Sequence, residues 1–386
     1  MFTLIENGDV YTPDHKGRTS VLLAGTRVER VGPVDRRGLD LLKVEHRVID
    51  ASGCYVVPGL IDPHVHLLGG SGESGFNTQT PEFFPAEIVR HGTTTVVGTL
   101  GVDTTMKTMA GLLAKAKGLK QDGLNAFVWT GGYDAEKASI LSSVREDVMF
   151  IEEVIGAGEV AISDERAMEL TREQIAKLAS DAHVGGMLSG KAGITHFHVG
   201  ERPSGLAPLR DVLEHTGVEP GWLYATHVQR NEKLMREAIA LARKGMNVDC
   251  DVIEHDAAKW LRYYRQHDGP PERLTFSSDA SATRPGLLWE ALRSCVVDHG
   301  MPLEDVLPHF TRCTAAILKL GLKGELAPCK AGDVLVLTRD GLDVAHVVSR
   351  GKVLVDDGRM VMEQPFLEAS DREVHLVGKK AGDAED

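Results

Sequence analysis

Two histidines that stand two residues apart, His64 and His66, are the first side chains in this 386-residue chain with an obvious capacity for chemistry. They follow the apolar run 56–62, whose composition is that of a strand. Because side chains alternate along a strand, both imidazoles project from the same face. Two neutral imidazoles that converge on one point favour a divalent metal, most often zinc. The motif alone leaves open that they are two surface histidines.

Other candidate ligands stand beside further strand-like segments. They share a position at the start or end of such a segment, and they are Glu159, His198, His227 and Asp279, with Tyr133 shortly after another segment. In a (β/α)8 barrel the carboxyl ends of the strands share one mouth, where active sites lie. The placement of four histidines and an aspartate at separate strand ends therefore predicts one metal site rather than scattered structural residues.

The middle of the chain alternates between strand-like and helical patterns. Its apolar segments are 56–62, 94–99, 126–130, 160–163, 194–198, 223–226, 246–252 and 274–278. Capping boxes at Ser143-x-x-Glu146 and Thr171-x-x-Gln174 mark two helix starts between them. This alternation over roughly 250 residues predicts an α/β fold, a (β/α)8 TIM-type barrel. A doubly wound sheet is the alternative, but no glycine-rich phosphate fingerprint follows the first strand.

Both ends of the chain are rich in short strands. We expect residues 1–55 and 330–378 to form one small β-sandwich domain, with the (β/α)8 barrel at 56–329. Residues 379–386 are polar and are expected to be a frayed tail.

Composition excludes several partners. The net charge is −13 and no basic cluster could match nucleic-acid phosphates. No apolar run reaches membrane-spanning length, and the N-terminal residues lack the pattern of a signal peptide. The five cysteines are odd in number and widely spaced, which favours reduced thiols in a cytoplasmic protein.

The ligand set indicates metal-assisted hydrolysis of an amide-like bond. One metal could take His64, His66 and Asp279, a second could take His198 and His227, and a carboxylate of the fourth strand would bridge them. Two metals about 3.5–4 Å apart lower the pKa of a bridging water and polarise a carbonyl oxygen. Asp279 could then take the proton of the bridging hydroxide and pass it to the leaving amine.

The order of these residues, with a β domain split around the barrel, resembles the amidohydrolase superfamily. Within it, the chain is similar to the isoaspartyl (β-aspartyl) dipeptidases over nearly its whole length. The matching stretches are 59–66, the glycine-rich loop that ends at Glu73, 130–133, 161–166, 197–200 and 226–231. The stretches after the third, fourth and sixth strands are specific to this dipeptidase group.

The resemblance implies a hydrolase with two Zn²⁺ per chain that cleaves the isopeptide bond of β-aspartyl dipeptides. Tyr133 would stabilise the developing oxyanion, and Glu73 would bind the free α-ammonium of the substrate. Arg166 and Arg230 would pair with its two carboxylates, a task to which guanidinium groups are suited. Relatives of this kind also assemble as homo-oligomers, often octamers.

The chain departs from that pattern at two positions. The superfamily usually bridges its metals with a lysine carboxylated by CO2, whereas Glu159 stands at this position; we expect Glu159 to bridge two zinc ions. After Asp279, a glycine-rich segment that ends in a serine is replaced by residues up to Thr283, whose hydroxyl can serve the same carboxylate.

Two other functions stay open. The segment from His198 to Glu201 resembles the His-x-x-Glu of mononuclear zinc deaminases in the same superfamily, where Glu201 would be the proton shuttle. A metal-free scaffold protein is the third possibility.

Among the remaining polar residues, His196 is interpreted as structural. Asp103 and Asp251 could hydrogen-bond to the ring nitrogen of a histidine ligand that does not face the metal, but they are not counted as site residues.

Overall fold

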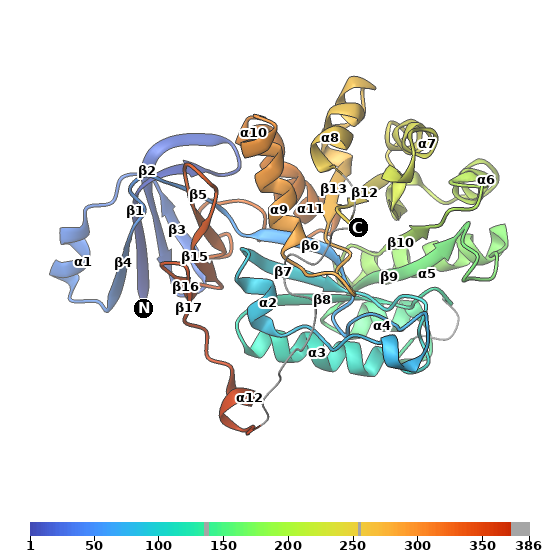
Figure 1. Ribbon diagram of the computed structural model, residues 1–386, viewed down its shortest axis with the longest axis horizontal. Helices are drawn as coiled ribbons and strands as arrows, with labels where there is room; N and C mark the ends of the chain where they lie inside the picture. The colour runs from blue at the N-terminus through green and yellow to red at the C-terminus, as the bar shows by residue number, and fades with distance from the viewer. Residues whose placement is uncertain (135–138, 254–255, 372–386) are drawn as a thin grey trace, which may run out of the picture.

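The computed structural model describes residues 1–134, 139–253 and 256–371 of the chain. Within these ranges the chain forms a barrel of parallel strands and a separate sheet built from both ends of the sequence (Figure 1). The predicted fold class, a (β/α)8 TIM-type barrel beside a small β domain, is confirmed. The tail predicted at 379–386 lies outside the described residues.

The barrel contains eight strands that follow one another around the ring in chain order. They are β6 (Leu60–Val65), β7 (Thr93–Gly98), β8 (Asn125–Thr130), β9 (Val154–Ile162), β10 (Ile194–Val199), β11 (Leu223–Thr226), β12 (Asn247–Asp251) and β13 (Leu274–Ser277). The ring closes where Val65 pairs in parallel with Ala280, and where the His66 N–H donates to the Ala280 carbonyl at 2.9 Å. This closure brings the end of β6 next to Asp279.

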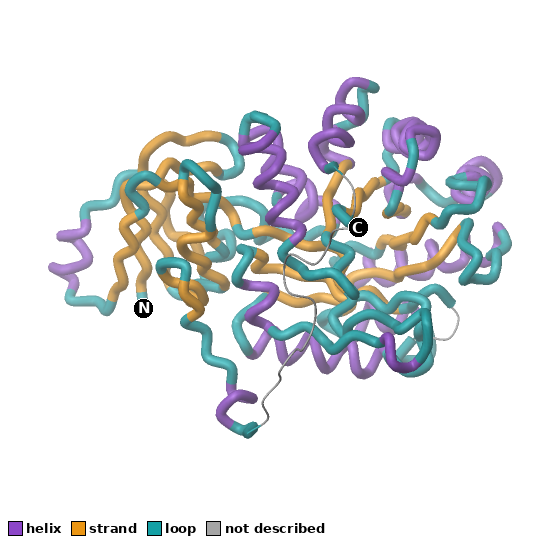
Figure 2. Tube along the Cα trace, viewed as in Figure 1, coloured by secondary structure: helices purple, strands orange, loops and turns teal. Residues whose placement is uncertain are grey.

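Helices cover the outside of the barrel strands (Figure 2). They are α2 (Pro85–Val89), α3 (Met109–Gln121), α4 (Val144–Phe150), α5 (Arg172–Ser189), α6 (Ala207–His215), α7 (Glu232–Ala242), α8 (Ala257–Gln266), α9 (Leu287–Arg293), α10 (Leu303–Val306) and α11 (Arg312–Ile317). Shorter helical turns are η1 (Phe76–Thr78), η2 (Pro220–Trp222), η3 (Val228–Arg230), η4 (Pro271–Arg273), η5 (Ser294–Asp298) and η6 (Leu307–Phe310). Both helix starts predicted from capping residues are confirmed, because Ser143 caps α4 and Thr171 caps α5.

The second sheet joins the two ends of the chain. Its strands are β1 (Phe2–Tyr11), β2 (His15–Ala24), β3 (Arg27–Val31), β4 (His46–Asp50), β5 (Cys54–Pro58), β14 (Val334–Thr338), β15 (Val344–Ser349), β16 (Lys352–Asp356) and β17 (Arg359–Met360). The helix α1 (Arg36–Leu42) joins β3 to β4, and α12 (Pro365–Glu368) follows β17 and places Phe366 against Phe84. Antiparallel pairing of β5 with β14 places Val56 opposite Val336 and connects the N-terminal strands to the C-terminal ones. The boundaries proposed for the domains, at 55/56 and 329/330, stay a proposal.

The first predicted barrel strand, 56–62, is wrong as a single element. The run is divided between β5 in the terminal sheet and β6 in the barrel, and the chain changes sheet at Gly59. A Cβ at this position would lie 2.3 Å from the Thr94 hydroxyl oxygen, so only glycine fits. Two apolar strands that follow one another without a polar break look like one strand in the sequence.

Candidate metal centre and active site

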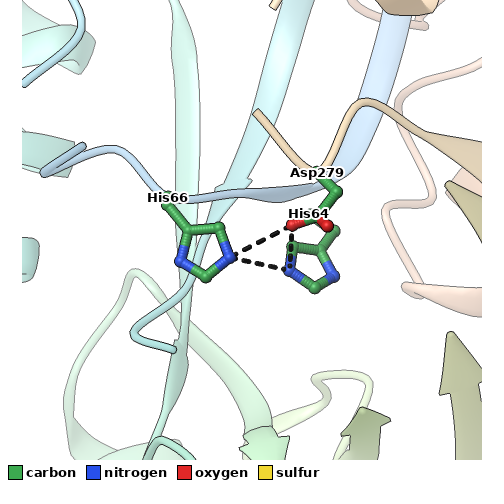
Figure 3. A group of neighbouring side chains, drawn as sticks. All are labelled: His64, His66 and Asp279. Carbon is green, nitrogen blue, oxygen red and sulfur yellow. Dashed lines mark hydrogen bonds and ion pairs between the residues drawn. The ribbon is translucent and has the colours of Figure 1, made fainter. Parts of the chain in front are cut away.

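Closure of the barrel gathers a first group of ligands at its mouth. His64 lies at the end of β6, His66 follows it, and Asp279 comes just after β13 (Figure 3). Asp279 Oδ1 is 3.2 Å from His64 Nε2 and 3.1 Å from His66 Nε2, and the two Nε2 atoms are 3.3 Å apart. Three such ligand atoms around one point can hold a divalent cation.

A second group of ligands lies on the neighbouring strand ends, and Glu159 connects it to the first. Glu159 Oε1 is 2.7 Å from His198 Nδ1 and 3.4 Å from His227 Nε2. Glu159 Oε2 is 3.3 Å from His64 Nε2 and 3.7 Å from His66 Nε2. One oxygen therefore faces each pair of histidines, which is the arrangement that a bridging carboxylate requires.

Bound metal ions would satisfy these residues better than their contacts with one another do. The Glu159 side chain is 1% exposed, and its Oε2 makes no hydrogen bond to any described residue. A buried carboxylate oxygen without a donor is costly unless a cation binds it. The donor set of imidazoles and carboxylates is the one that zinc prefers.

A bulge in β9 directs Glu159 into the barrel. Thr195 of β10 pairs with Ala157 and Phe197 pairs with Val160, so two residues of β9, Gly158 and Glu159, stand opposite one residue of β10. Bulges of this kind redirect a side chain and are common beside active sites. The sequence predicted that this strand starts at residue 160, but it starts at Val154, so Glu159 lies inside the strand rather than at its opening.

The backbone at two other ligands is unusual. His227 has φ of 64° and Asp279 has φ of 45°, which is the left-handed region that non-glycine residues rarely adopt. Each residue stands where a barrel strand stops and the chain turns sharply away. Such conformations persist where the surrounding structure compensates their cost, and they cluster at functional sites.

Asp251, at the end of β12, hydrogen-bonds to the ring nitrogen of the ligand His227 that faces away from Glu159. Its Oδ2 is 2.6 Å from His227 Nδ1, and the Gln229 amide donates to the same oxygen. The contact fixes the Nδ1–H tautomer and leaves His227 Nε2 directed at Glu159. Asp103 has no such role, because its carboxylate accepts from the backbone N–H groups of Thr105 and Met106.

Asp164 is a site residue that the sequence analysis missed. Its Oδ2 lies 2.9 Å from His198 Nε2 and 2.9 Å from Arg166 Nη2, and Arg166 Nε donates to Oδ1 at 2.9 Å. Burial opposes its ionisation, but Arg166 and His198 hold the pKa of Asp164 well below its usual range. The residue falls within the matching stretch 161–166, which is the signal that could have identified it.

Tyr133 lies over the second pair of ligands. Its hydroxyl is 2.8 Å from His198 Nδ1 and 3.3 Å from Arg166 Nη2. Burial, together with the charge of Glu159, raises the pKa of Tyr133 well above its usual value. The phenol therefore keeps its proton and is a hydrogen-bond donor at neutral pH.

An outer cavity of about 500 Å³ at the barrel mouth is lined by charged residues, which are Glu73, Asp164, Glu165, Arg166, Glu201, Arg202 and Arg230. Three of them, Glu73, Arg166 and Arg230, also line a deeper cavity of about 170 Å³, which contains most of the candidate metal ligands. Arg166 Nη1 pairs with Glu73 at 3.0 Å. Arg230 donates from Nε to the Val199 carbonyl at 3.0 Å.

Two sequence predictions do not agree with the geometry. Ser281, not Thr283, lines the deeper cavity, while the Thr283 hydroxyl is buried without a partner among the described residues. The chain turns after Asp279, so the register of this segment could not be read from residue types. Glu201 is 84% exposed and pairs with Arg230 at 3.2 Å, which separates it from the position that a proton shuttle needs.

The carboxylates also set the protonation of the histidines when no metal is bound. Burial lowers the pKa of His64, but the charges of Glu159 and Asp279 outweigh it and raise that pKa to about 9. In the same way Asp251 and Glu159 raise the pKa of His227 to about 10 against the effect of burial. Protons therefore occupy the positions where a metal would bind, and a metal must displace them.

Residues 55–354 match the amidohydrolase family, and the chain belongs to this family. Members of this hydrolase family bind divalent metals, and the structure contains groups of residues that could hold such metals. The family predicted from the sequence is confirmed.

Among solved structures, the chain is similar to the β-aspartyl dipeptidase of Fervidobacterium islandicum AW-1. The two are 35% identical, with a TM-score of 0.89, over 93% of this chain and 98% of that chain. A second structure of that enzyme, in complex with a β-Asp-Leu dipeptide, has a TM-score of 0.87 at the same identity and the same coverage of both chains. The resemblance to β-aspartyl dipeptidases predicted from the sequence is therefore confirmed.

Curated relatives are more distant or match over short stretches. An adenine deaminase of Deinococcus radiodurans is 40% identical over 89 residues, which cover 23% of this chain and only 13% of that protein. A dihydroorotase of Lactobacillus johnsonii is 24% identical over 326 residues, 78% of this chain and 71% of that protein.

In the described part of the chain, no helix has the length and apolar character needed to cross a membrane.

Proposed function

We propose that this amidohydrolase cleaves the isopeptide bond of β-aspartyl (isoaspartyl) dipeptides with two zinc ions per chain. The observation that carries the proposal is the deeper cavity, whose charged lining residues, apart from the candidate metal ligands, are one acid, Glu73, and two arginines, Arg166 and Arg230. A β-aspartyl dipeptide carries one ammonium and two carboxylates, so its charges match Glu73, Arg166 and Arg230. The similarity to a dipeptidase that was solved with β-Asp-Leu supports the same substrate class.

Six residues would hold the metals. One zinc would bind His64, His66 and Asp279, the other would bind His198 and His227, and Glu159 would bridge them. A metal pair of this kind supplies Lewis-acid polarisation of the carbonyl and a nucleophile derived from water at neutral pH.

The protein's own side chains would orient the substrate and move its protons. Arg166 and Arg230 would bind the two carboxylates, and Glu73 would bind the α-ammonium. Burial raises the pKa of Asp279, but His64 and its neighbours outweigh this effect and keep the pKa low, so the carboxylate can accept a proton and deliver it to the leaving amine. Tyr133, which keeps its proton, would donate a hydrogen bond to the developing oxyanion.

The alternatives have less support. A mononuclear deaminase would need Glu201 beside the metal, whereas its side chain points into solvent and pairs with Arg230. A metal-free scaffold gives no reason for the convergence of every candidate ligand at one mouth. We also propose a cytoplasmic homo-oligomer; light scattering of the purified chain would test this and would distinguish an octamer from smaller assemblies.

A substrate panel tests the proposed function. The zinc-loaded protein is incubated with β-Asp-Leu, α-Asp-Leu, adenine and dihydroorotate, and the products are separated by chromatography. We expect release of leucine from β-Asp-Leu alone. Ammonia release from adenine, or ring opening of dihydroorotate without cleavage of β-Asp-Leu, would overturn the proposal.

A further inference from the structure

His196 lies directly beneath the candidate metal centre and contacts one of its ligands. It precedes His198 by two residues on β10, so both rings point into the barrel, with His196 one layer deeper. Its side chain is fully buried, and its Nε2 is 2.9 Å from His64 Nδ1. The sequence analysis interpreted this residue as structural.

The ring of His196 is held in place by aromatic neighbours. It stacks on Trp129, with ring centroids 5.2 Å apart and planes at 20°, and it meets Tyr224 at 4.6 Å. The Trp129 indole N–H donates to the carbonyl of Pro63, the residue before His64, at 3.0 Å. Trp129 therefore both packs on the His196 ring and hydrogen-bonds to the backbone next to His64.

The position of His196 has costs that packing alone does not explain. Its Nδ1 makes no hydrogen bond of ordinary geometry with a described residue and interacts only weakly with the Tyr224 backbone, and a poorly satisfied buried polar atom disfavours folding. An apolar side chain at position 196 could pack against Trp129 without burying a poorly satisfied nitrogen atom. The contact with His64 is the feature that only a polar residue provides.

We infer that His196 is a positioning residue for the metal ligand His64. Its Nε2 accepts a hydrogen bond from the His64 Nδ1–H, so His64 Nε2 faces Asp279 and Glu159 and can bind a metal there once its proton is displaced. The tautomers follow from this hydrogen-bond network. The inference rests on the metal centre proposed above.

The two pairs of histidines are thus supported by different chemistry. A carboxylate, Asp251, stands behind His227, whereas a neutral imidazole stands behind His64. Because His196 hydrogen-bonds to His64, whereas Asp251 holds His227, the zinc bound by His64 should be the one that depends on His196.

Substitution of His196 in the full chain tests the inference through zinc binding. The variants are His196→Gln, whose amide can occupy the place of Nε2, and His196→Asn, whose amide is too short to reach His64. Zinc dissociation constants are measured by competition with a chromophoric chelator. We expect His196→Asn to weaken one of the two zinc ions by about 10–100-fold, the effect usual for lost ligand support, and His196→Gln to restore most of the affinity.

A buried histidine elsewhere provides the matched control. The His309 ring donates to the Leu274 carbonyl at 3.0 Å and lies edge-on to Phe276, and it makes no hydrogen bond to a candidate ligand in the described part of the chain, so His309→Asn should leave both zinc affinities unchanged. Equal zinc affinities in the wild type, His196→Asn and His196→Gln would overturn the inference, as would equal losses in the Asn and Gln variants. The measurement needs no substrate. A protein that binds two zinc ions but cleaves no β-aspartyl peptide would thus refute the proposed function and leave this inference intact.

Discussion

Arg166 and Glu73 form an ion pair across the mouth of the outer cavity, with Arg166 Nη1 3.0 Å and 3.1 Å from the two carboxylate oxygens. These are the groups proposed to bind opposite charges of the substrate. In the absence of substrate they neutralise each other. A zwitterion can replace both halves of the pair, since its ammonium takes the place of the guanidinium and its carboxylate takes the place of Glu73.

Removal of the Glu73 charge should therefore lower kcat/KM for substrates that carry a free ammonium group and should matter little for substrates that lack one. We expect Glu73→Gln to lower kcat/KM for β-Asp-Leu by about 10–100-fold, the size of one charge-assisted hydrogen bond. Acetylation of the substrate's amino group should cost the wild type a similar factor and cost the variant little more. Glu165→Gln, in the same cavity, is the control and should leave kcat/KM unchanged. Equal losses on acetylation in Glu73→Gln and the wild type would contradict this role.

Replacement of Glu159 should remove the connection between the two metal positions. We expect Glu159→Gln to retain at most one zinc per chain and to lose activity, as measured by elemental analysis and by β-Asp-Leu hydrolysis. Glu159→Lys should not recover either property in bicarbonate, because Glu159 already contacts His198 at 2.7 Å and a carboxylated lysine is longer. Glu153→Gln, at the other end of β9, should keep both zinc ions. Two zinc ions in Glu159→Gln would show that the carboxylate is not a bridge.

The stability of the metal-free protein should fall as the pH rises above neutrality. The pKa of His64 is raised to about 9 and that of His227 to about 10, both above the ordinary value near 6.5. A group with a raised pKa contributes stability that is complete below its unfolded pKa and is lost as the pH passes through its folded pKa. We thus expect the thermal midpoint in chelator to decline between about pH 6.5 and 10.

Bound zinc should remove most of that decline, because the metal replaces the protons and still compensates the buried carboxylates. Parallel thermal scans with zinc and with chelator give the comparison directly. Identical pH dependence in the two series would mean that these histidines are not where the metal binds.

Loss of the Tyr133 hydroxyl should affect the chemical step more than zinc binding. Tyr133→Phe is expected to lower kcat by about 10²–10³-fold, the range found when one oxyanion donor is removed, with KM and zinc content nearly unchanged. Tyr263→Phe, on α8, is the matched control and should have wild-type kinetics. A change confined to KM in Tyr133→Phe would instead indicate a role in substrate binding.

The sequence predicted the barrel and most of the candidate ligands, because strand ends and His-x-His spacing are local features. It did not predict the division of 56–62 at Gly59, since the two halves pair with strands far away in the chain, β5 with β14 and β6 with β7. The bulge at Glu159 depends in the same way on pairing with β10. The contact of His196 with His64 joins residues 132 positions apart, and only the closed barrel shows it.

Zinc titration of the metal-free chain, followed by β-Asp-Leu hydrolysis, tests the binuclear dipeptidase most directly. Activity should be absent without metal and should rise to a plateau at two zinc ions per chain. A plateau at one zinc, full activity in chelator, or no cleavage at two zinc ions would contradict it.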